Sequence, residues 1–416
     1  MPYLHSLQNG AENTVTGYLN VSVCGGNTAN TEFEFLTGNS MAFLPQGSIP
    51  YQQYITKELP ALPAYLASLG YETVATHPYY ADGWDRDKVY PLLGFSESIF
   101  KDQYWGAGYV RKYVSDNSCV DKIIELYEKK EEGTPLFVFN VTMQNHGGYS
   151  DTYDNFTPDI TVEGVESTPL SQYLSLVRLS DQALEKLISY FEEADEKTIV
   201  VFFGDHQPND TVAAPILNLN GMTTKTLTED QLKLRYEVPY VIWANYDIDA
   251  ESGKDTSANY LAADVLHYAG ISENAYGSYL LELQQNYPVI SAMRVLTKDG
   301  LDTNSSSLKQ ELKDYQSLQY YQLFDWKKSE CADRSLIRKE MKERKQEFVR
   351  MNQTQINETK SKKWCKWLPL LAAFLIPLLI SVIICIDHEV YPFGERCLLQ
   401  VDMYHQYCPF FYRVCG

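Results

Sequence analysis

The sequence predicts an α/β domain whose sheet is mostly parallel and carries helices on both faces. Segments with helical spacing and segments with strand-like spacing alternate along the chain. The strand-like segments are almost continuously apolar, which is typical of strands buried on both faces. Several of them are followed at once by a polar cluster, at the sheet edge where ligands bind in folds of this class.

The individual elements follow from apolar runs and from the residues that bound them. Gly70 ends a helix, and Pro135 precedes a strand. The elements predicted in chain order are a helix over 59–69, a strand over 71–76, a strand over 136–142, a helix over 170–194, strands over 198–203 and 240–244, and a last helix within 300–325.

The charge balance excludes one large class of function. Residues 1–326 hold 20 Lys and Arg against 44 Asp and Glu, a net charge of −24. Nucleic-acid binding needs a basic surface that displaces counterions, so we predict no nucleic-acid partner. The cysteines contain no Cys-x-x-Cys pair, so neither a zinc knuckle nor a thioredoxin-like motif is indicated.

The C-terminal part differs from the rest. Residues 326–366 are rich in charge and mostly basic, and we interpret them as a linker. Residues 367–386 carry no charge and are long enough to span a bilayer, which predicts a transmembrane helix, with a buried core helix as the alternative. Residues 387–416 are aromatic and rich in cysteine, and they are too few for a complete domain.

The first candidate site residue is Thr28, which follows two glycines and opens a helix. A hydroxyl at a helix N-terminus lies near free N–H groups and the positive end of the dipole, an environment that suits an alkoxide or a phosphate ester. The alternative is that Thr28 only caps the helix, and the segment alone favours the cap.

Asp205 and His206 form the second candidate, in the turn directly after the strand over 198–203. From such a turn both side chains can reach one crevice. A carboxylate oxygen and an imidazole nitrogen suit Mn²⁺, Mg²⁺ or Zn²⁺. The alternative is a turn with an ordinary Asp cap.

His77, Trp84 and Arg86 lie within ten residues after another strand. Arg can bind a phosphate through two parallel hydrogen bonds, and Trp can cover an apolar or glycerol face. His146 lies in a glycine-rich loop after the strand over 136–142, where it suits a proton donor or phosphate ligand. For each of these residues an ordinary loop role is the alternative.

Together, four segments in register across about residues 1–325 resemble the lipoteichoic acid synthase family, within the alkaline phosphatase and sulfatase superfamily. GNTANTEFEFLTGNS resembles the nucleophile segment, HPYYADGWDR the glycerol-phosphate pocket, NVTMQNHGGY the Asn-His loop, and VVFFGDHQP the metal-ligand strand end. The resemblance implies a sulfatase-like fold. It also implies roles, which are Thr28 as nucleophile and metal ligand, Asp205 and His206 as metal ligands, His146 as catalytic acid, and His77, Trp84, Arg86 and His146 as substrate-binding residues.

The chain departs from this family pattern in two places. The family pocket commonly has an acidic residue where this chain has Tyr79. The family's first strand, with a metal-binding glutamate, precedes the segment that Met1–Leu7 resembles. We therefore expect a domain over 1–325 that is N-terminally truncated, with its first strand and one metal ligand missing. The implied cofactor is a divalent metal, Mn²⁺ before Mg²⁺ or Zn²⁺.

A second resemblance covers residues 341–416, which are similar to the opening of the YfhO family of membrane proteins. We interpret residues 387–416 as the truncated start of such a membrane region. The basic residues before the apolar run place residue 366 in the cytoplasm by the positive-inside rule, whereas the family's catalytic domain lies outside. We therefore expect an artificial join of two coding regions near residues 326–350.

The resemblance implies an enzyme that transfers phosphoglycerol from phosphatidylglycerol to a glycerol-phosphate or glycan acceptor in cell-envelope polymer synthesis. The transfer would pass through a phosphothreonine-type intermediate, at the cell membrane, with the catalytic domain extracellular. Two alternatives stay open. One is a phosphodiesterase or sulfatase-type hydrolase of the same superfamily, and the other is a catalytically dead, membrane-tethered fragment.

Overall fold

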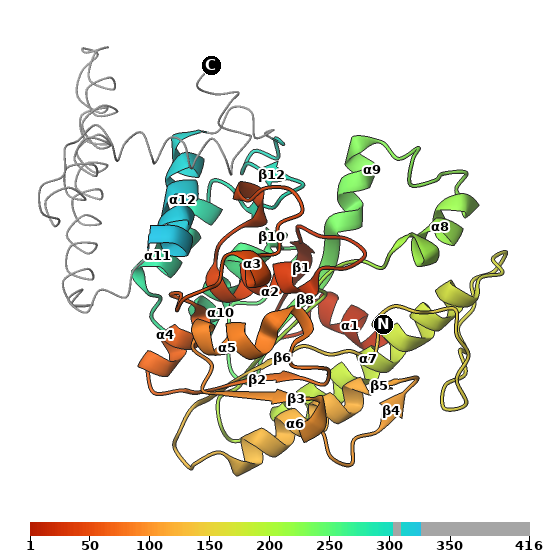
Figure 1. Ribbon diagram of the computed structural model, residues 1–416, viewed down its shortest axis with the longest axis horizontal. Helices are drawn as coiled ribbons and strands as arrows, with labels where there is room; N and C mark the ends of the chain where they lie inside the picture. Colours follow the sequence, from red (N-terminus) through yellow and green to blue (C-terminus); the bar gives the residue numbers. More distant parts are fainter. Residues whose placement is uncertain (303–308, 326–416) are drawn as a thin grey trace, which may run out of the picture. The chain divides into compact units, whose positions relative to one another are not determined.

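Two separate sheets lie at the centre of the described part of the chain (Figure 1). The larger has the strand order β10-β1-β8-β7, with β9 also paired to β1, and the smaller has the order β3-β2-β6. The strands are β1 Thr14–Asn20, β2 Glu72–His77, β3 Glu97–Phe100, β6 Leu136–Asn140, β7 Ile199–Phe203, β8 Glu237–Ala244, β9 Glu251–Ser252 and β10 Thr256–Ser257. Two small hairpins pair β4 Tyr109–Val110 with β5 Tyr113–Val114, and β11 Val289–Ile290 with β12 Val295–Leu296.

The structure is a computed structural model and describes residues 1–302 and 309–325 of the 416. These residues belong to one unit, Met1–Lys328. The predicted linker, the predicted transmembrane helix over 367–386 and the YfhO-like segment lie outside the described residues. Among the helices within the described ranges, none combines the length and the apolar character that a membrane crossing needs.

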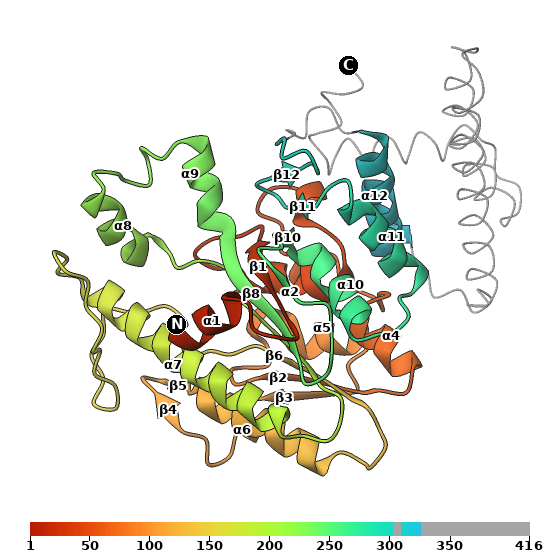
Figure 2. The same cartoon turned by 180° about the vertical axis from the view of Figure 1, so that it is seen from behind.

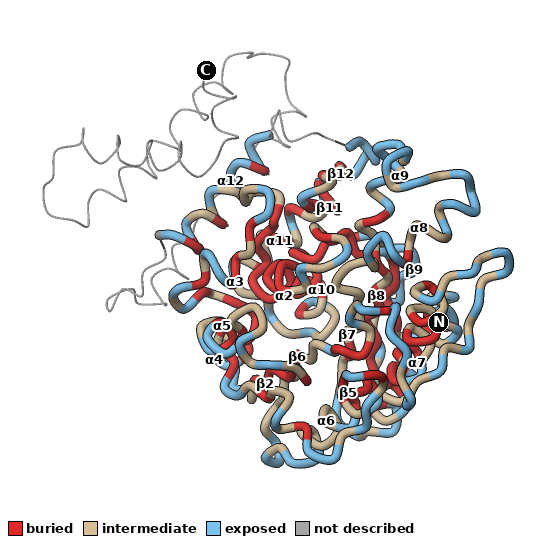
Figure 3. Tube along the Cα trace, turned by 45° about the vertical axis from the view of Figure 1, so that its right-hand side comes forward, coloured by how far each residue is buried: buried red, intermediate tan, exposed pale blue. Residues whose placement is uncertain are grey.

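Helices cover both faces of the sheets (Figure 2). On one face lie α1, α6 and α7, and on the other lie α2, α4, α5 and α10. Figure 3 shows α2 and α10 buried along most of their length. The helices are α1 Pro2–Gln8, α2 Thr28–Thr37, α3 Pro50–Gln53, α4 Leu62–Ser68, α5 Arg86–Leu93, α6 Asp116–Lys129, α7 Thr168–Glu192, α8 Asp210–Leu219, α9 Glu229–Lys233, α10 Ala258–Tyr268, α11 Ala275–Gln284 and α12 Gln310–Tyr320.

Strand β8 shows why the sheet is apolar on both sides. Val241 and Trp243 pack with α1 and α7, while Tyr240 and Ile242 pack in the core that includes α2 and α10. Successive side chains of a strand point to opposite faces, so a strand covered on both faces must be apolar throughout. The predicted α/β architecture with helices on both faces is therefore confirmed.

The expectation of a mostly parallel sheet is correct for β3-β2-β6 and wrong for the larger sheet. β8 runs antiparallel to both β1 and β7, so that sheet is mixed. The chain leaves β7, forms α8 and α9, and enters β8 beside the point where β7 ended, with Phe203 opposite Tyr240. A chain that returns at the same end of a sheet must run in the opposite direction.

The predicted helices and strands occur with shifted ends, but β1 and several short strands, which are β3, β4, β5 and β9 to β12, were not predicted. The helix over 170–194 is α7, the strand over 198–203 is β7, and the strand over 136–142 is β6. β1 was not predicted because Thr14, Thr16 and Asn20 make it look polar, yet all three side chains are buried. Gly17 lies so close to Lys254 that a Cβ there would come within 2.2 Å of the Lys254 carbonyl oxygen.

Strands β6 and β7 each have one unpaired edge. β6 pairs only with β2, and β7 pairs only with β8, within the described residues. A cavity of about 1740 Å³ includes the space between these edges, and residues 135–142 and 196–209 are part of its lining. Most residues of the two strands are only half-buried although nearly all are apolar. Among the described residues, no strand pairing therefore joins the larger sheet to the smaller one.

Candidate active site

Thr28 is held against the end of β7 by a tight turn. Gly25 has φ +77°, and a Cβ there would come within 3.2 Å of Asn209. The Gly25 N–H donates to the Gln207 carbonyl at 2.9 Å, which ties the turn to the loop after β7. Asn27, with φ 67°, is the residue that precedes α2, so the alternative that Thr28 is the cap is wrong. The Thr28 hydroxyl instead donates to Asp205 Oδ2 at 2.5 Å.

Asp205 and His206 leave β7 toward the same point. The Asp205 carbonyl accepts from the Thr31 hydroxyl at 2.7 Å, which fixes the turn on α2. His206 Nδ1 donates to the Gln207 carbonyl at 2.8 Å, because a carbonyl oxygen can only accept. His206 Nε2 then lies 3.5 Å from Thr28 Oγ1 and 3.2 Å from Asp205 Oδ2.

These three atoms, Thr28 Oγ1, Asp205 Oδ2 and His206 Nε2, form a compact donor set. Carboxylate oxygen, hydroxyl oxygen and imidazole nitrogen suit a divalent cation such as Mn²⁺, Mg²⁺ or Zn²⁺. In the part of the chain that the structure describes, no group of three or more His, Cys, Asp or Glu could hold a metal. The donors therefore fit a metal in kind, but they are fewer than the four of a structural Zn²⁺ site or the six of Mg²⁺.

His77 ends β2 and is buried in the same cavity. Its Nδ1 donates to the Val141 carbonyl at 2.9 Å. Burial, and then the nearby Arg86 cation, lowers the pKa of His77 to about 4. The ring is therefore neutral at pH 7, with Nε2 as an acceptor. Trp84, with φ 59°, lines the cavity beside it.

Arg86 begins α5 and forms a buried ion pair. Its Nε and Nη2 donate to the Glu32 carboxylate, and its Nη1 donates to the Gly83 carbonyl at 3.0 Å. Glu32 also accepts from the hydroxyls of Tyr51 and Tyr90. Both charged groups line the cavity, but most donors of the guanidinium are already in use. Sequence reasoning missed Glu32, although it stands four residues after Thr28 and so on the same face of α2.

His146 lies in the loop after β6, which Arg111 holds in place. Arg111 is buried and donates through Nη2 to the carbonyls of Gln144, at 2.6 Å, and His146, at 2.7 Å. The Tyr113 hydroxyl lies 3.0 Å from His146 Nδ1. Burial lowers the pKa of His146. Arg111 and Tyr113 were not predicted; their only signal is a basic and aromatic run before α6.

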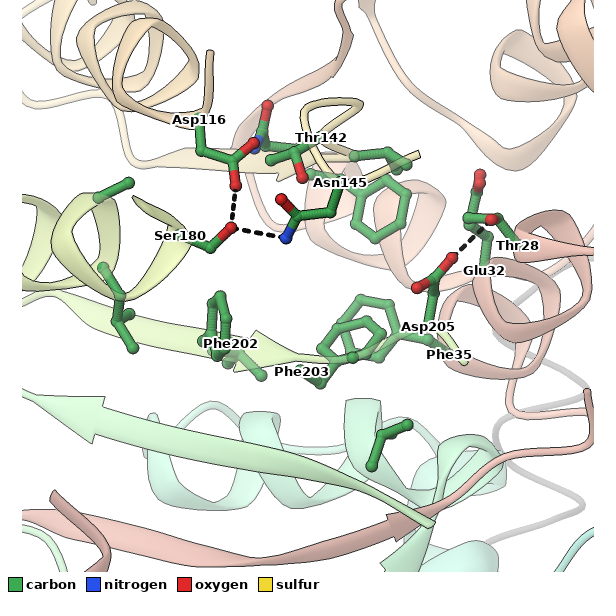
Figure 4. Close-up of a pocket in the computed structure, with 18 of the residues that line it drawn as sticks. Thr28, Glu32, Phe35, Asp116, Thr142, Asn145, Ser180, Phe202, Phe203 and Asp205 are labelled. Atoms are coloured by element: carbon green, nitrogen blue, oxygen red, sulfur yellow. Dashed lines mark hydrogen bonds between the residues drawn. The ribbon is translucent and has the colours of Figure 1, made fainter. Parts of the chain in front are cut away.

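A second polar group lines the cavity farther along β6 (Figure 4). Asp116 Oδ2 accepts from the Ser180 hydroxyl at 2.5 Å, and Asn145 Nδ2 donates to the same hydroxyl oxygen at 2.7 Å. Asp116 Oδ1 is buried without a hydrogen-bond partner. Burial raises the pKa of Asp116 to about 6. No sequence pattern singled out this carboxyl group.

All seven predicted site residues therefore line one cavity, and they fall into two groups. Thr28, Asp205 and His206 touch one another. The other four line the same space from β2, the turn before α5, the start of α5 and the loop after β6. Of these four, Arg86 is engaged by Glu32. Figure 4 shows Thr28 and Asp205 together at the end toward which β7 points.

Comparison with known proteins gives one family and several relatives. The profile of the family described as Sulfatase matches residues 1–271. The chain is 34% identical over 313 residues to the putative cyclic beta-1,2-glucan modification protein of Rhizobium meliloti (strain 1021), covering 72% of this chain and 48% of the relative. It is 24% identical over 213 residues to lipoteichoic acid synthase 1 of Bacillus subtilis (strain 168), covering 49% and 32%. The chain thus spans about half or less of these relatives.

Two solved structures share the fold. The Streptococcus pyogenes phosphoglycerol transferase GacH, in complex with sn-glycerol-1-phosphate, matches with a TM-score of 0.58 and 21% identity, covering 77% of this chain and 78% of the other. The lipoteichoic acid synthase LtaP from Listeria monocytogenes matches with a TM-score of 0.56 and 19% identity, covering 77% and 84%. At these identities the matches show a common fold.

Proposed function

Because the chain belongs to the sulfatase family of the alkaline phosphatase superfamily, we propose that it carries the catalytic part of a metal-dependent phosphoglycerol transferase. The donor is a phosphatidylglycerol-type lipid, and the acceptor is a glycerol phosphate or a glycan of the cell envelope. The observation that carries the proposal is the contact of the Thr28 hydroxyl with Asp205 and His206 at the N-terminus of α2.

A divalent metal, Mn²⁺ first and Mg²⁺ or Zn²⁺ as the other candidates, would be held by Asp205, His206 and Thr28 and would supply positive charge that favours the alkoxide form of the hydroxyl. Asp205 Oδ2 already accepts the hydrogen bond of Thr28 and is placed to take its proton. The N-terminus of α2 adds free N–H groups beside the same oxygen.

In the first half of the reaction, Thr28 Oγ1 bonds to the phosphorus of the lipid, and the bond from phosphorus to the diacylglycerol oxygen breaks. His146 gives a proton to that leaving oxygen. Although burial lowers the pKa of His146, the negative charge of a bound phosphodiester raises it again. In the second half, an acceptor hydroxyl attacks the phosphorus and gives its proton to His146, the bond from phosphorus to Thr28 Oγ1 breaks, and Thr28 takes its proton back from Asp205.

His77 and Trp84 would position the glycerol unit. The neutral His77 ring offers Nε2 to a glycerol hydroxyl, and Trp84 offers an apolar surface. Arg86 would bind the phosphate through the N–H groups that Glu32 and Gly83 leave free. A glycan acceptor fits the relative named as a putative cyclic beta-1,2-glucan modification protein. With a lipid donor the reaction would take place at the cell membrane, on its outer face if the chain follows the family that it resembles.

The test is to incubate the purified protein with Mn²⁺, a fluorescent phosphatidylglycerol analogue and a cyclic β-1,2-glucan. Transfer gives labelled diacylglycerol together with a phosphoglycerol-modified glucan. Free glycerol phosphate instead would indicate the hydrolase alternative. Thr28→Ala should abolish both products, whereas Thr161→Ala, an exposed loop threonine outside the cavity, should leave them unchanged. Full activity in Thr28→Ala would overturn the proposal.

A further inference from the structure

The turn between β4 and β5 consists of two residues, Arg111 and Lys112. Two-residue hairpin turns favour glycine, asparagine or aspartate, because their first central residue needs a positive φ. Here Arg111 takes that conformation, with φ 56°. Holding a non-glycine residue there costs free energy, and such strain clusters at positions whose side chains have a function. The strain therefore points to the side chains of this turn.

Arg111 is a buried cation that no carboxylate neutralises. It is 3% exposed, and its Nη groups donate only to the carbonyls of Gln144, His146 and Gly148. Its Nε is buried without a hydrogen-bond partner. A buried charge is normally compensated by a charge of opposite sign. Among the described residues Arg111 forms no ion pair, so it leaves an excess of positive charge beside the loop that carries His146.

Lys112 adds a second positive charge at the same place. Its side chain is exposed and lines the cavity. Its Nζ lies 5.4 Å from the ring centroid of Tyr113, and 3.9 Å from the point that a Cβ on Gly148 would occupy. The Tyr113 hydroxyl in turn lies 3.0 Å from His146 Nδ1. The ammonium group of Lys112 is therefore close to the proposed proton donor.

The other cationic side chains of the cavity are either paired or far from this end. Three of them form ion pairs, which are Arg86 with Glu32, Lys130 with Glu196, and Arg235 with Asp210. Lys197 precedes β7, whereas Thr28 and Asp205 lie at the other end of that strand. Within the described residues, Lys112 is therefore the cavity cation at the site end whose charge no carboxylate matches.

The loop after β6 adds a backbone donor. Across a trans peptide bond, the C=O of one residue and the N–H of the next point in opposite directions. Since the His146 carbonyl turns toward Arg111, the Gly147 N–H turns away from it. That N–H has no hydrogen-bond partner among the described residues, and a Cβ on Gly147 would meet no atom within 4 Å. The donor therefore faces open space.

Positive charge beside a free N–H favours an anion. A planar carboxylate is best bound by a guanidinium group through two parallel hydrogen bonds. The guanidinium groups of Arg86 and Arg111 already donate to protein oxygens. An ammonium group instead binds a phosphate as a point charge. The donors that remain thus suit a phosphate better than a carboxylate.

We propose that the Lys112 ammonium and the Gly147 N–H form a binding subsite for a phosphate group of the substrate. The proposal deepens the proposed function and rests on it for the identity of the substrate. The phosphate then belongs either to the donor lipid or to a glycerol-phosphate acceptor.

The probe is sn-glycerol-1-phosphate, titrated into the full chain by isothermal titration calorimetry with and without Mn²⁺. We expect saturable binding of one molecule per chain. Lys112→Met should weaken this binding about fivefold, because it removes a charged donor. Lys112→Arg keeps the charge and should weaken it less than about twofold.

Lys197→Met is the matched control. Lys197 is exposed, lines the same cavity, and lies 5.3 Å from the ring centroid of Tyr246, but at the far end of β7. Its loss should change the affinity less than about twofold. No binding by the wild type, or unchanged binding by Lys112→Met, would overturn the proposal. Equal weakening by Lys112→Met and Lys197→Met would overturn it too, since the effect would then come from net charge alone.

The transfer assay distinguishes the two sources of the phosphate. If Lys112→Met lowers kcat/KM for the lipid with a neutral cyclic β-1,2-glucan as acceptor, the phosphate belongs to the donor. If the loss appears only with a glycerol-phosphate acceptor, the phosphate belongs to the acceptor. Wild-type transfer by Lys112→Met with both acceptors would contradict the proposal. The titration needs no transfer, so a wild-type chain that binds the probe without transferring refutes the proposed function and not the phosphate subsite.

Discussion

The ion pair of Arg86 with Glu32 should stabilise the fold through charge neutralisation in a dry environment. Both side chains are almost fully buried, at 3% and 4% exposure. The variant Arg86→Met keeps most of the volume and removes the cation. It leaves a buried carboxylate whose remaining donors are the hydroxyls of Tyr51 and Tyr90. Removing one member of a buried pair costs about 3–5 kcal/mol. Because two donors remain, we expect the lower end, about 3 kcal/mol at pH 7.

The pH dependence of the free energy of unfolding distinguishes Arg86→Met from the wild type more sharply than the value at pH 7 does. Burial alone would raise the pKa of Glu32, and the Arg86 cation outweighs it and holds the pKa below its usual value. In the wild type, the stability that comes from the lowered pKa of Glu32 is therefore fully present above about pH 4.3, and it is lost as the pH falls through that lowered pKa. In Arg86→Met, burial acts unopposed and raises the pKa. The folded state then binds the proton more tightly, and stability is regained as the pH falls through that raised pKa.

Urea denaturation followed by circular dichroism, at several pH values from 4 to 8, measures the free energy of unfolding of variant and wild type. The difference between them gives both the loss at pH 7 and its change with pH. Arg178→Met is the matched control, because its partner Asp159 is exposed and such pairs contribute about 1 kcal/mol or less. Glu32→Gln in the Arg86→Met background should recover about 1–2 kcal/mol, since it removes the buried charge. An Arg86→Met protein within about 1 kcal/mol of wild type, or one that loses further stability relative to wild type in acid, refutes this reasoning.

Burial raises the pKa of Asp116 from 3.8 to about 6, so the folded state holds that proton more tightly and stability should fall by about 3 kcal/mol as the pH rises from about 4 to 6. Asp116→Asn should remove this fall of the free energy of unfolding with pH, as measured in urea titrations. An unchanged pH dependence in Asp116→Asn would contradict the prediction. Gly17→Ala should destabilise the protein by about 3 kcal/mol in the same assay, because its methyl group would lie 2.2 Å from the Lys254 carbonyl oxygen. Gly108→Ala is the control and should cost little, because the nearest atom to its methyl group would lie at 3.5 Å. Equal losses of stability in the two variants would show that the backbone moves to relieve the close approach. Mn²⁺ should stabilise the folded state by about 2.7 kcal/mol at a hundredfold excess over its dissociation constant, and it should therefore raise the midpoint of thermal unfolding. Asp205→Asn should cancel this rise. A rise that survives in Asp205→Asn would place the ion elsewhere.

Local sequence patterns were enough to predict several of the central strands and helices. The run before Gly204 is apolar and β-branched or aromatic, so a buried strand and a functional turn after it could be predicted there, and β7 occupies Ile199–Phe203. β1 could not be predicted, because Thr14, Thr16 and Asn20 are polar and yet buried. Asn20 gains its buried hydrogen bond only from a distant partner, the Thr256 carbonyl.

Other features depend on pairings that the sequence does not display. The direction of β8 is fixed by where the chain re-enters the sheet, not by its own residues. Arg86 looked like a free phosphate ligand because Glu32 lies 54 positions away in sequence. Asp116 meets Ser180 and Asn145 only after folding, so its buried and partly unsatisfied carboxyl group left no sequence pattern.

The packing of Phe35 against both Phe139 and Phe203 bears on the alignment of the site. His77 and His146 are carried by the smaller sheet, whereas Asp205 follows a strand of the larger one. Because no backbone ladder joins the two sheets among the described residues, the distance between nucleophile and proton donor depends on side-chain packing around the helix that begins with Thr28.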